Sequence, residues 1–248
     1  MGTELSGRVV AITGASSGIG EATALACAAS GAAVALAARR AERIEELASR
    51  IVADGARAIA VPTDVAQEDQ ARAFVERTKA ELGRLDVLVN NAGVMLLGPI
   101  EDAPTEEWRR MIHANLFGVL YCTHAALPIM REQGGGHIVN VSSVAGRVAR
   151  AGAGVYNLTK FGVGAFSESL RQEGVPIGVR VTIIEPGAVD TELVGHNRPE
   201  VLEQLRKGFE GVPPLSAQDI AGAILYAIGQ PQNVSVNEIL VRPSGQVR

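Results

Sequence analysis

Short apolar runs alternate along the chain with longer stretches in which apolar residues recur at helical spacing. Val9–Ile12 and Val87–Val89 are apolar at consecutive positions, a pattern typical of parallel strands that are covered on both faces. We expect strands at residues 8–13, 33–38, 58–63, 86–90, 137–142, 179–185 and 238–241, and helices at residues 18–30, 41–54, 67–82, 105–131, 154–173 and 217–228. This alternation predicts an α/β fold in three layers, a doubly wound parallel sheet with right-handed crossovers, in one domain over residues 1–248.

The stretch from about Ala188 to Pro214 is the least regular part of this pattern. It is polar, contains scattered Gly and Pro residues and comes late in the chain. A mobile lid is one interpretation, and an ordinary surface excursion is the other. No linker, internal repeat or low-complexity segment indicates a second domain.

Composition limits the classes of function. The 248 residues are 47% hydrophobic, and their formal net charge is −4 without a basic cluster, so nucleic acid and an anionic membrane are poor partners. No apolar stretch is long enough to span a bilayer, and residues 1–7 lack the features of a signal peptide. Cys27 and Cys122 fit buried thiols in a reducing compartment, and the four histidines lack metal-ligand spacing. We therefore expect a soluble cytoplasmic protein without a structural metal.

The first predicted strand runs into a glycine-rich segment, Thr13–Gly20, that opens a helix. Gly14 allows a tight turn, Gly18 allows a pyrophosphate to approach the backbone, and Gly20 allows the helix to pack closely on the strand. Free N–H groups at the helix start would then bind the anion. The alternative is a glycine-rich turn without a ligand.

The second predicted strand ends at Ala38 and is followed by Arg39 and Arg40. Sites that prefer NAD commonly carry an acidic residue here, which binds the ribose 2′-hydroxyl. An acidic residue would repel a 2′-phosphate, whereas a guanidinium can bind it in bidentate fashion. Arg39 therefore predicts a preference for NADPH over NADH, unless both arginines merely face solvent at a helix start.

Tyr156 and Lys160 are four residues apart, with Ser143 upstream. Residues i and i+4 share a helix face, so the phenol and the ammonium would lie side by side. At about 4 Å and an effective dielectric near 20, two unit charges interact by about 4 kcal/mol, which equals roughly 3 pKa units. We therefore expect Lys160 to lower the pKa of Tyr156 from about 10 towards neutrality, as general acid–base catalysis requires. The spacing alone also occurs by chance in amphipathic surface helices.

Taken together, these segments resemble the short-chain dehydrogenase/reductase family in its compact single-domain form. The resemblance covers essentially the whole chain. It rests on the order and spacing of Thr13–Gly20, Asp64–Val65, Asn90–Gly93, Asn115–Gly118, Ser142–Ser143, Tyr156 with Lys160, and Pro186–Gly187. It implies a Rossmann-type fold and hydride transfer between NADP(H) and a carbonyl or alcohol substrate.

The resemblance also implies a role for each matched residue. Ser143, rather than Ser142, would polarise the substrate carbonyl. Tyr156 would donate or accept the proton, Lys160 would bind the nicotinamide ribose and lower the tyrosine pKa, and Asn115 would support a water chain to Lys160. The cofactor would be bound by Gly14, Ser16, Ser17, Gly18, Ile19, Gly20 and Arg39, by Asp64 and Val65 at the adenine, by Asn91, Ala92 and Gly93 on the floor, by Tyr156 and Lys160, and by Pro186, Gly187, Val189 and Thr191 at the carboxamide and a nearby phosphate.

The substrate pocket should lie beyond the carboxyl ends of the strands, with walls at Val94–Leu97, Val144–Arg150 and residues 188–211. Arg147 and Arg150 could anchor a substrate carboxylate, or they could be solvated or lie at a subunit contact. Several segments look most like an NADP-dependent branch of the family that includes clavulanate aldehyde reductase and the dehydrogenases of serine and other 3-hydroxy acids. A 3-hydroxy acid is therefore the alternative to a general aldehyde or ketone substrate.

Family members pair two long helices across two-fold axes, so the resemblance implies a homodimer or homotetramer through helices 105–131 and 154–173. Two other classes of protein stay open, an NADPH-sensing regulator without chemistry and a Rossmann-like scaffold. The presence of Ser143, Tyr156 and Lys160 argues against a regulator, because a sensor needs no proton donor. Arg39 argues against a scaffold.

Overall fold

The computed structural model describes residues 4–208 and 211–247. Within these residues the chain forms one sheet of seven parallel strands in the order β3-β2-β1-β4-β5-β6-β7. The strands are β1 (Val9–Thr13), β2 (Ala33–Ala38), β3 (Ala58–Pro62), β4 (Val87–Asn90), β5 (Gly136–Val141), β6 (Val179–Pro186) and β7 (Glu238–Val241). The sheet confirms the predicted doubly wound α/β fold.

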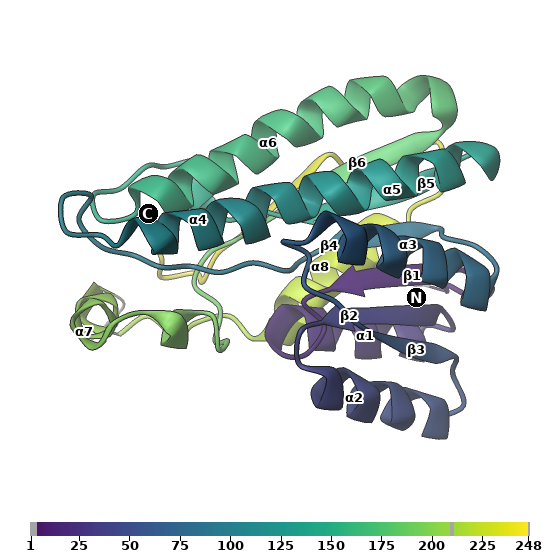
Figure 1. Cartoon of the computed structure of the whole chain (residues 1–248), viewed down its shortest axis with the longest axis horizontal. Coiled ribbons are helices and arrows are strands. Elements are labelled where there is room, and N and C mark those ends of the chain that lie inside the picture. The colour runs from purple at the N-terminus through teal and green to yellow at the C-terminus, as the bar shows by residue number, and fades with distance from the viewer. Residues whose placement is uncertain (1–3, 209–210, 248) are drawn as a thin grey trace.

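Helices cover both faces of the sheet (Figure 1). Two hydrophobic cores lie on opposite faces of the sheet. One contains side chains of α3, α5 and α6, and the other contains side chains of α1, α2 and α8. The α-helices are α1 (Gly18–Ala29), α2 (Ala41–Ala53), α3 (Glu68–Leu82), α4 (Thr105–Ile112), α5 (Gly118–Glu132), α6 (Gly154–Gly174), α7 (Pro199–Gly208) and α8 (Ala217–Ile228). The other helical turns are the π-helix η1 (His113–Phe117) and the 3₁₀ turns η2 (Val144–Gly146), η3 (Val175–Ile177) and η4 (Val194–His196).

The strands contribute to two separate cores because successive side chains point to opposite faces of the sheet. In β1, Val10 and Ile12 join the core beneath α1, α2 and α8, whereas Val9 and Ala11 join the core beneath α3, α5 and α6. Every residue of β1 is buried. Burial on both faces explains why the strands are apolar at consecutive positions.

The segment predicted as one helix over residues 105–131 is helical throughout, but it is not α-helical throughout. α4 ends at Ile112, the π-helix η1 follows, and α5 continues from Gly118 to Glu132. A π-helix widens one turn and occurs mostly at functional sites. Asn115 lies in this turn and is 1% exposed. Periodicity did not reveal the π-helical turn because the chain is α-helical on both sides of it.

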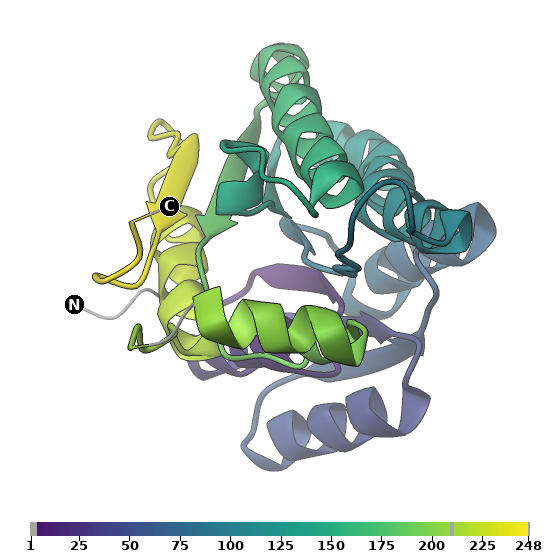
Figure 2. The same ribbon diagram turned by 90° about the vertical axis from the view of Figure 1, so that its left-hand side faces the viewer.

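The stretch from residue 188 to residue 214 is more regular than the sequence predicted, since it contains η4 and α7. α7 begins at Pro199, a residue type that suits the first turn of a helix. Figures 1 and 2 show α7 at the end of the molecule where α6 begins.

The strand order reverses between β1 and β4. In sheets of this kind, ligands bind outside the carboxyl ends of the strands at the point of reversal. The loops after Thr13 and Asn90 therefore flank the expected site. None of the helices in the described part of the chain is long and apolar enough to cross a membrane.

Candidate active site

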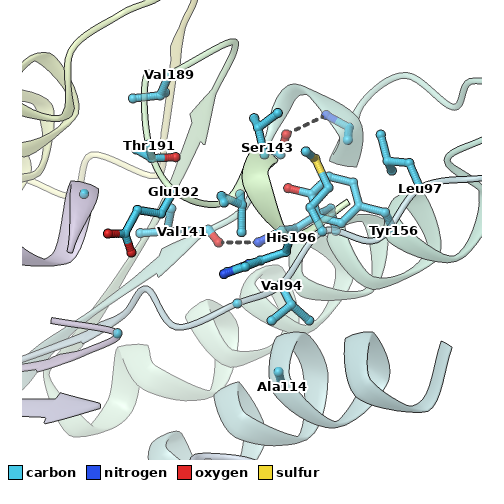
Figure 3. Close-up of a pocket in the computed structure, with 18 of the residues that line it drawn as sticks. Val94, Leu97, Ala114, Val141, Ser143, Tyr156, Val189, Thr191, Glu192 and His196 are labelled. Atoms are coloured by element: carbon cyan, nitrogen blue, oxygen red, sulfur yellow. Dashed lines mark hydrogen bonds between the residues drawn. The ribbon is translucent and has the colours of Figure 1, made fainter. Parts of the chain in front are cut away.

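A cavity of about 1520 Å³ opens at the carboxyl edge of the sheet. It is lined by the loops after β1 to β6, the start of α6, and parts of η4 and α7. All of the site residues implied by the resemblance line this cavity, except Gly20 and Asn115. The fold thus brings the predicted residues together, and Figure 3 shows part of the arrangement.

The glycine-rich loop after β1 has the tight geometry that the sequence predicted. Gly14 and Gly18 have φ angles of 67° and 55°, which are unfavourable for other residues. A Cβ atom at Gly14 would lie 2.8 Å from the Cα of Ala92, and one at Gly20 would clash with the Gly14 carbonyl oxygen. Ser17 precedes α1 without a side-chain hydrogen bond to the helix start, so the N–H groups there stay available to an anion.

The two arginines after β2 behave differently. Arg39 is exposed and lines the cavity, and its guanidinium has no hydrogen bond or ion pair to any residue that the structure describes. Arg40 binds the glycine-rich loop, with its Nε 3.0 Å from Ser16 Oγ and its Nη2 2.7 Å from Ser17 Oγ. Its Nη1 donates to Glu192 at 2.6 Å. Sequence reasoning missed this contact because 152 positions separate Arg40 from Glu192.

The residues after β4 are bonded to the loop after β1. Asn91 Nδ2 donates to the carbonyl oxygens of Thr13 at 2.9 Å and Gly14 at 3.2 Å. In return, Thr13 Oγ1 accepts from the backbone N–H groups of Asn91 and Ala92, each at 3.0 Å. These bonds fix the floor of the cavity against the glycine-rich loop.

Asp64 and Val65 lie beside the cavity where β3 ends. The Asp64 N–H donates to Gln70 Oε1 at 2.8 Å, and Asp64 Oδ1 accepts from the Ala66 N–H at 3.1 Å. Val65 packs against Gly118, where an added Cβ would lie 2.7 Å from Val65 Cγ2. A local turn and close packing therefore hold both residues in place.

Ser143 and Tyr156 meet at another part of the cavity (Figure 3). The Ser143 Oγ accepts from the Ala145 N–H at 3.1 Å and is hydrogen-bonded to the Tyr156 phenol. The Ser143 hydroxyl also donates to the Pro186 carbonyl oxygen at 3.4 Å, and the Ser142 hydroxyl donates to the Lys160 carbonyl oxygen at 3.1 Å. Of the two serines, Ser143 is the one whose hydroxyl lies against the Tyr156 phenol, and its catalytic role stays a prediction.

Tyr156 and Lys160 both lie on α6 and line the cavity, but the expected direction of the Tyr156 pKa was wrong. Burial raises the pKa of Tyr156 to about 12, against a smaller lowering by the Ser143 hydroxyl. Burial also lowers the pKa of Lys160 to about 8. Lys160 Nζ lies 5.8 Å from the tyrosine ring centroid and donates to the Val141 carbonyl oxygen at 2.9 Å. The expectation counted the attraction between two charges and omitted their loss of solvation.

The Asn115 side chain joins three parts of the fold. Its Oδ1 accepts from the Val94 N–H at 2.8 Å, and its Nδ2 donates to the Val94 carbonyl at 2.9 Å and to Thr159 Oγ1 at 3.1 Å. A Cβ atom on Gly93 would lie 3.1 Å from Asn115 Oδ1 and 3.9 Å from Lys160 Nζ. Asn115 therefore holds the segment after β4 against α6, close to the Lys160 ammonium.

The segments predicted as substrate walls line the cavity in part. Val94, Met95 and Leu97 line the cavity, whereas Leu96 joins a buried cluster with Tyr156. From the second wall, the residues in contact with the cavity are Val144, Ala145, Val148 and Arg150.

Arg147 is absent from the cavity lining, and acidic partners hold its guanidinium. Its Nε donates to Glu185 Oε2 at 2.7 Å, and its Nη2 is paired with Glu238. These pairs tie the segment after Ser143 to β6 and β7, so Arg147 is not a substrate anchor. Arg150 does line the cavity, and its guanidinium has no partner among the described residues.

Gln246 is a cavity residue that sequence reasoning missed. Its Oε1 accepts from the Ala188 N–H at 2.9 Å, and a Cβ atom on Gly187 would clash with the same oxygen. Gln246 thus shapes the loop after β6 from a position 58 residues away. No local signal marks it, because its partner is a backbone group.

The donors around the cavity fit a dinucleotide phosphate. The glycine-rich loop would accept the pyrophosphate, and the free guanidinium of Arg39 together with Ser16 would hold a 2′-phosphate. Among the described residues, no group of three or more His, Cys, Asp or Glu side chains could hold a metal ion.

Comparisons with known proteins show similarity to oxidoreductases, some of them in complex with NADP. A family model described as short chain dehydrogenase matches residues 8–201, a region that includes every predicted site residue. An uncharacterized oxidoreductase of Staphylococcus saprophyticus is 43% identical over 246 residues, which is 96% of this chain and 97% of that protein. Serine dehydrogenase in complex with NADP+ has a TM-score of 0.90 at 33% identity, over 97% of each chain. An alcohol dehydrogenase from Thermococcus sibiricus in complex with 5-hydroxy-NADP has a TM-score of 0.87 at 31% identity, over 97% of this chain and 98% of that one.

Proposed function

The chain is an oxidoreductase of the short-chain dehydrogenase/reductase family, and we propose that it transfers hydride between NADP(H) and the carbonyl or alcohol carbon of a small molecule. The observation that carries this proposal is the meeting of Ser143, Tyr156 and Lys160 in a cavity that also contains the glycine-rich loop and Arg39. One sheet supports all of these residues, so we propose residues 1–248 as a single catalytic domain.

The nicotinamide supplies or accepts the hydride when NADP(H) is bound, and the protein supplies orientation and the proton. Tyr156 would donate its phenolic proton to the substrate oxygen during reduction, since a phenol with a pKa of about 12 is protonated at neutral pH. Ser143 would donate a hydrogen bond to the same oxygen as negative charge develops there. The Lys160 ammonium would stabilise the phenolate that remains and would bind the ribose hydroxyls.

Asn115 would support proton return to the site. Its side chain is fully occupied with Val94 and Thr159, so its contribution is to fix the space beside Gly93 and Lys160. A water chain to Lys160 would run through this space.

Carbonyl reduction is the direct test of the reaction. We expect NADPH oxidation by purified protein with members of a panel of aldehydes and ketones. Ser143→Ala should lower turnover by about 10²-fold, as loss of one donor to a developing oxyanion does. Ser142→Ala is the matched control, and its turnover should stay within about threefold because its hydroxyl bonds the Lys160 carbonyl, whereas the Ser143 hydroxyl bonds the Tyr156 phenol. Equal loss in both variants would contradict the assignment.

The preference for NADPH rests on Arg39, whose guanidinium is unpaired at the cavity. We expect wild type to bind NADPH at least about tenfold more tightly than NADH, a difference of about 1.4 kcal/mol. Arg39→Ala should remove most of this difference without weakening NADH binding. Fluorescence titration measures all four affinities, and similar affinities of wild type for both cofactors would contradict the preference.

A 3-hydroxy acid is the second candidate substrate. Arg150 offers an unpaired guanidinium at the cavity, and the similar serine dehydrogenase acts on a substrate with a carboxylate. We expect Arg150→Met to raise the KM for 3-hydroxy acids and to leave the KM for neutral alcohols unchanged. An equal effect on both substrate classes would remove this candidate.

We also propose that the protein is a homodimer or homotetramer. Leu158 and Phe161 on α6 are 58% and 44% exposed, and Phe117 in η1 is 37% exposed. An apolar surface of this kind fits an interface between subunits. Size-exclusion chromatography with light scattering tests the proposal, and a monomer at micromolar concentration would contradict it.

A further inference from the structure

Glu192 lies in the segment after β6 and lines the same cavity as Arg39 and Arg40. Its carboxylate holds two arginines from the region after β2. Oε2 accepts from Arg40 Nη1 at 2.6 Å, and Oε1 accepts from Arg43 Nη1 at 2.7 Å. Figure 3 shows this carboxylate pointing away from Tyr156, so it does not face the reacting end of the cavity.

The donors that Glu192 occupies belong to the region where a 2′-phosphate would bind. Arg40 also donates to Ser16 Oγ and Ser17 Oγ in the glycine-rich loop. Carboxylate and phosphate oxygens accept from a guanidinium in the same bidentate geometry. A phosphate beside Arg39 and Ser16 would therefore compete with Glu192 for the donors of Arg40.

We propose that Glu192 is a cofactor-specificity residue, an internal competitor that the 2′-phosphate of NADP(H) displaces from Arg40 and Arg43. The inference rests on the proposed use of NADP(H). Displacement releases the segment of residues 189–202 from α2. A cofactor without the 2′-phosphate leaves the contact in place.

The charges favour displacement over sharing. Hydrogen bonds from Arg43, and to a lesser extent from Arg40, lower the pKa of Glu192 to about 2. This carboxylate is therefore charged at any physiological pH and repels a phosphate. The ion pairs themselves are weak, because the side chains of Glu192, Arg40 and Arg43 are 46%, 43% and 51% exposed and are screened by solvent. A phosphate with nearly two negative charges can replace them.

The same segment reaches the substrate end of the cavity. Val194, His196 and Leu202 line the cavity beyond Glu192. The hydrogen bonds from the Gly195 N–H to the Glu192 carbonyl and from the Asn197 N–H to the Val194 carbonyl keep this part of the segment together. Release of Glu192 therefore changes the freedom of residues that surround the substrate.

Binding of two small probes to the full-length protein tests the competition. The probes are 2′,5′-ADP, which carries the 2′-phosphate, and 5′-AMP, which lacks it. Calorimetry measures the affinity of each. We expect E192Q to bind 2′,5′-ADP about threefold to fivefold more tightly than wild type, the range for loss of one exposed charge interaction, with unchanged affinity for 5′-AMP. Glu192→Ala should behave in the same way. Glu45→Gln removes a charge from an exposed position of α2 and should change neither affinity.

Hydrogen exchange tests the coupling to the segment without a measurement of activity. In wild type, 2′,5′-ADP should speed exchange of the backbone amides in residues 189–202, and 5′-AMP should not. In E192Q, exchange should already be fast without a probe. Unchanged exchange in wild type with 2′,5′-ADP would overturn the coupling.

The outcomes separate this inference from the proposed function. If wild type prefers 2′,5′-ADP and E192Q matches Glu45→Gln in both affinities, Glu192 is no competitor and the NADP(H) preference stands. If wild type binds both probes equally and Arg39→Ala changes nothing, the NADP(H) preference itself fails, and the inference fails with it.

Discussion

Ionisable side chains are buried both where the parallel strands begin, the amino edge of the sheet, and where they end, the carboxyl edge, but their roles differ. At the amino edge, His137 of β5 and Arg180 of β6 are paired positions and are 2% and 7% exposed. At the carboxyl edge, Tyr156 and Lys160 are 6% and 7% exposed. The degree of burial alone does not separate a structural edge from a reactive one.

The difference lies in what the buried groups bond. At the amino edge, Arg180 Nη1 donates to three carbonyl oxygens within residues 230–234. Thr182 Oγ1 donates to the Val236 carbonyl at 2.5 Å and therefore accepts from His137 Nε2 at 2.8 Å. His137, Arg180 and Thr182 are absent from the cavity lining. These groups fix the turn between α8 and β7.

At the carboxyl edge the buried groups keep hydrogen-bonding capacity and line the cavity. Lys160 Nζ carries three N–H donors, and among the described residues its hydrogen-bond acceptor is the Val141 carbonyl. The Tyr156 phenol is bonded to Ser143. Burial lowers the pKa of His137 to about 3 and that of Lys160 to about 8. At the amino edge, His137 Nδ1 and Arg180 Nε are also buried without a hydrogen-bond partner among the described residues. A perturbed pKa therefore marks chemistry only where the group also faces a cavity.

Tyr156→Phe tests the reactive edge most sharply. Turnover with NADPH and a carbonyl substrate should fall by about 10³-fold, within the range for loss of a general acid. The affinity for NADPH should stay within about twofold, because the aromatic ring and its packing remain. Steady-state kinetics and fluorescence titration measure the two effects. Turnover near the wild-type level would place the proton donor elsewhere.

His137→Gln tests the structural edge. The folded-state pKa of about 3 lies below the ordinary value of 6.5, so the unfolded state binds the extra proton between these pH values. The stability that this group contributes is present above pH 6.5 and is lost as the pH falls towards 3. Between pH 6.5 and pH 4, wild type should lose about 3 kcal/mol more of its unfolding free energy than the variant.

Urea unfolding across this pH range measures the difference, and acidic residues elsewhere affect both proteins alike. Turnover of His137→Gln at pH 7 should equal that of wild type, since the side chain lies at the edge opposite the cavity. If the variant lost as much stability in acid as wild type, or if it lost turnover, the distinction between a structural and a reactive edge would be wrong.

The sequence was sufficient for those parts of the site whose residues are close together along the chain. The glycine-rich loop occupies contiguous positions, and Tyr156 and Lys160 share one helix, so local spacing determines their geometry. The strands were predicted for a related reason. Their burial on both faces leaves an apolar run that can be recognised without knowledge of the neighbours.

The remaining features depend on contacts between distant segments or on burial. Arg40 meets Glu192 across 152 positions, and Gln246 meets the backbone of Ala188 across 58. The sequence did not predict α7, because the scattered Gly and Pro residues around it are typical of a loop. The direction of the Tyr156 pKa was wrong because spacing reports which charges are near but not how much water surrounds them.

Lys160→Met gives the smallest expected effect on stability. It tests whether a buried charged group at the carboxyl edge lowers the stability of the fold. The pKa of about 8 in the folded state lies below the ordinary 10.5, so burial of this ammonium opposes folding at neutral pH. The shift corresponds to about 3 kcal/mol, and loss of the hydrogen bond to the Val141 carbonyl offsets about 1 kcal/mol of it. The variant should therefore be more stable than wild type by about 1–2 kcal/mol at pH 7, although its turnover is lost.

The gain should depend on pH in a defined direction. Between pH 8 and 10.5 the unfolded wild type binds the proton more often than the folded protein, so wild-type stability rises with pH in this window. The advantage of Lys160→Met should therefore shrink as the pH approaches 10. Urea unfolding at pH 7 and pH 10 measures it. If the variant were less stable than wild type at both pH values, Lys160 would stabilise the fold as the amino-edge groups do. If its extra stability decreased with pH, the buried Lys160 cation beside Tyr156 would lower the stability of the wild-type protein.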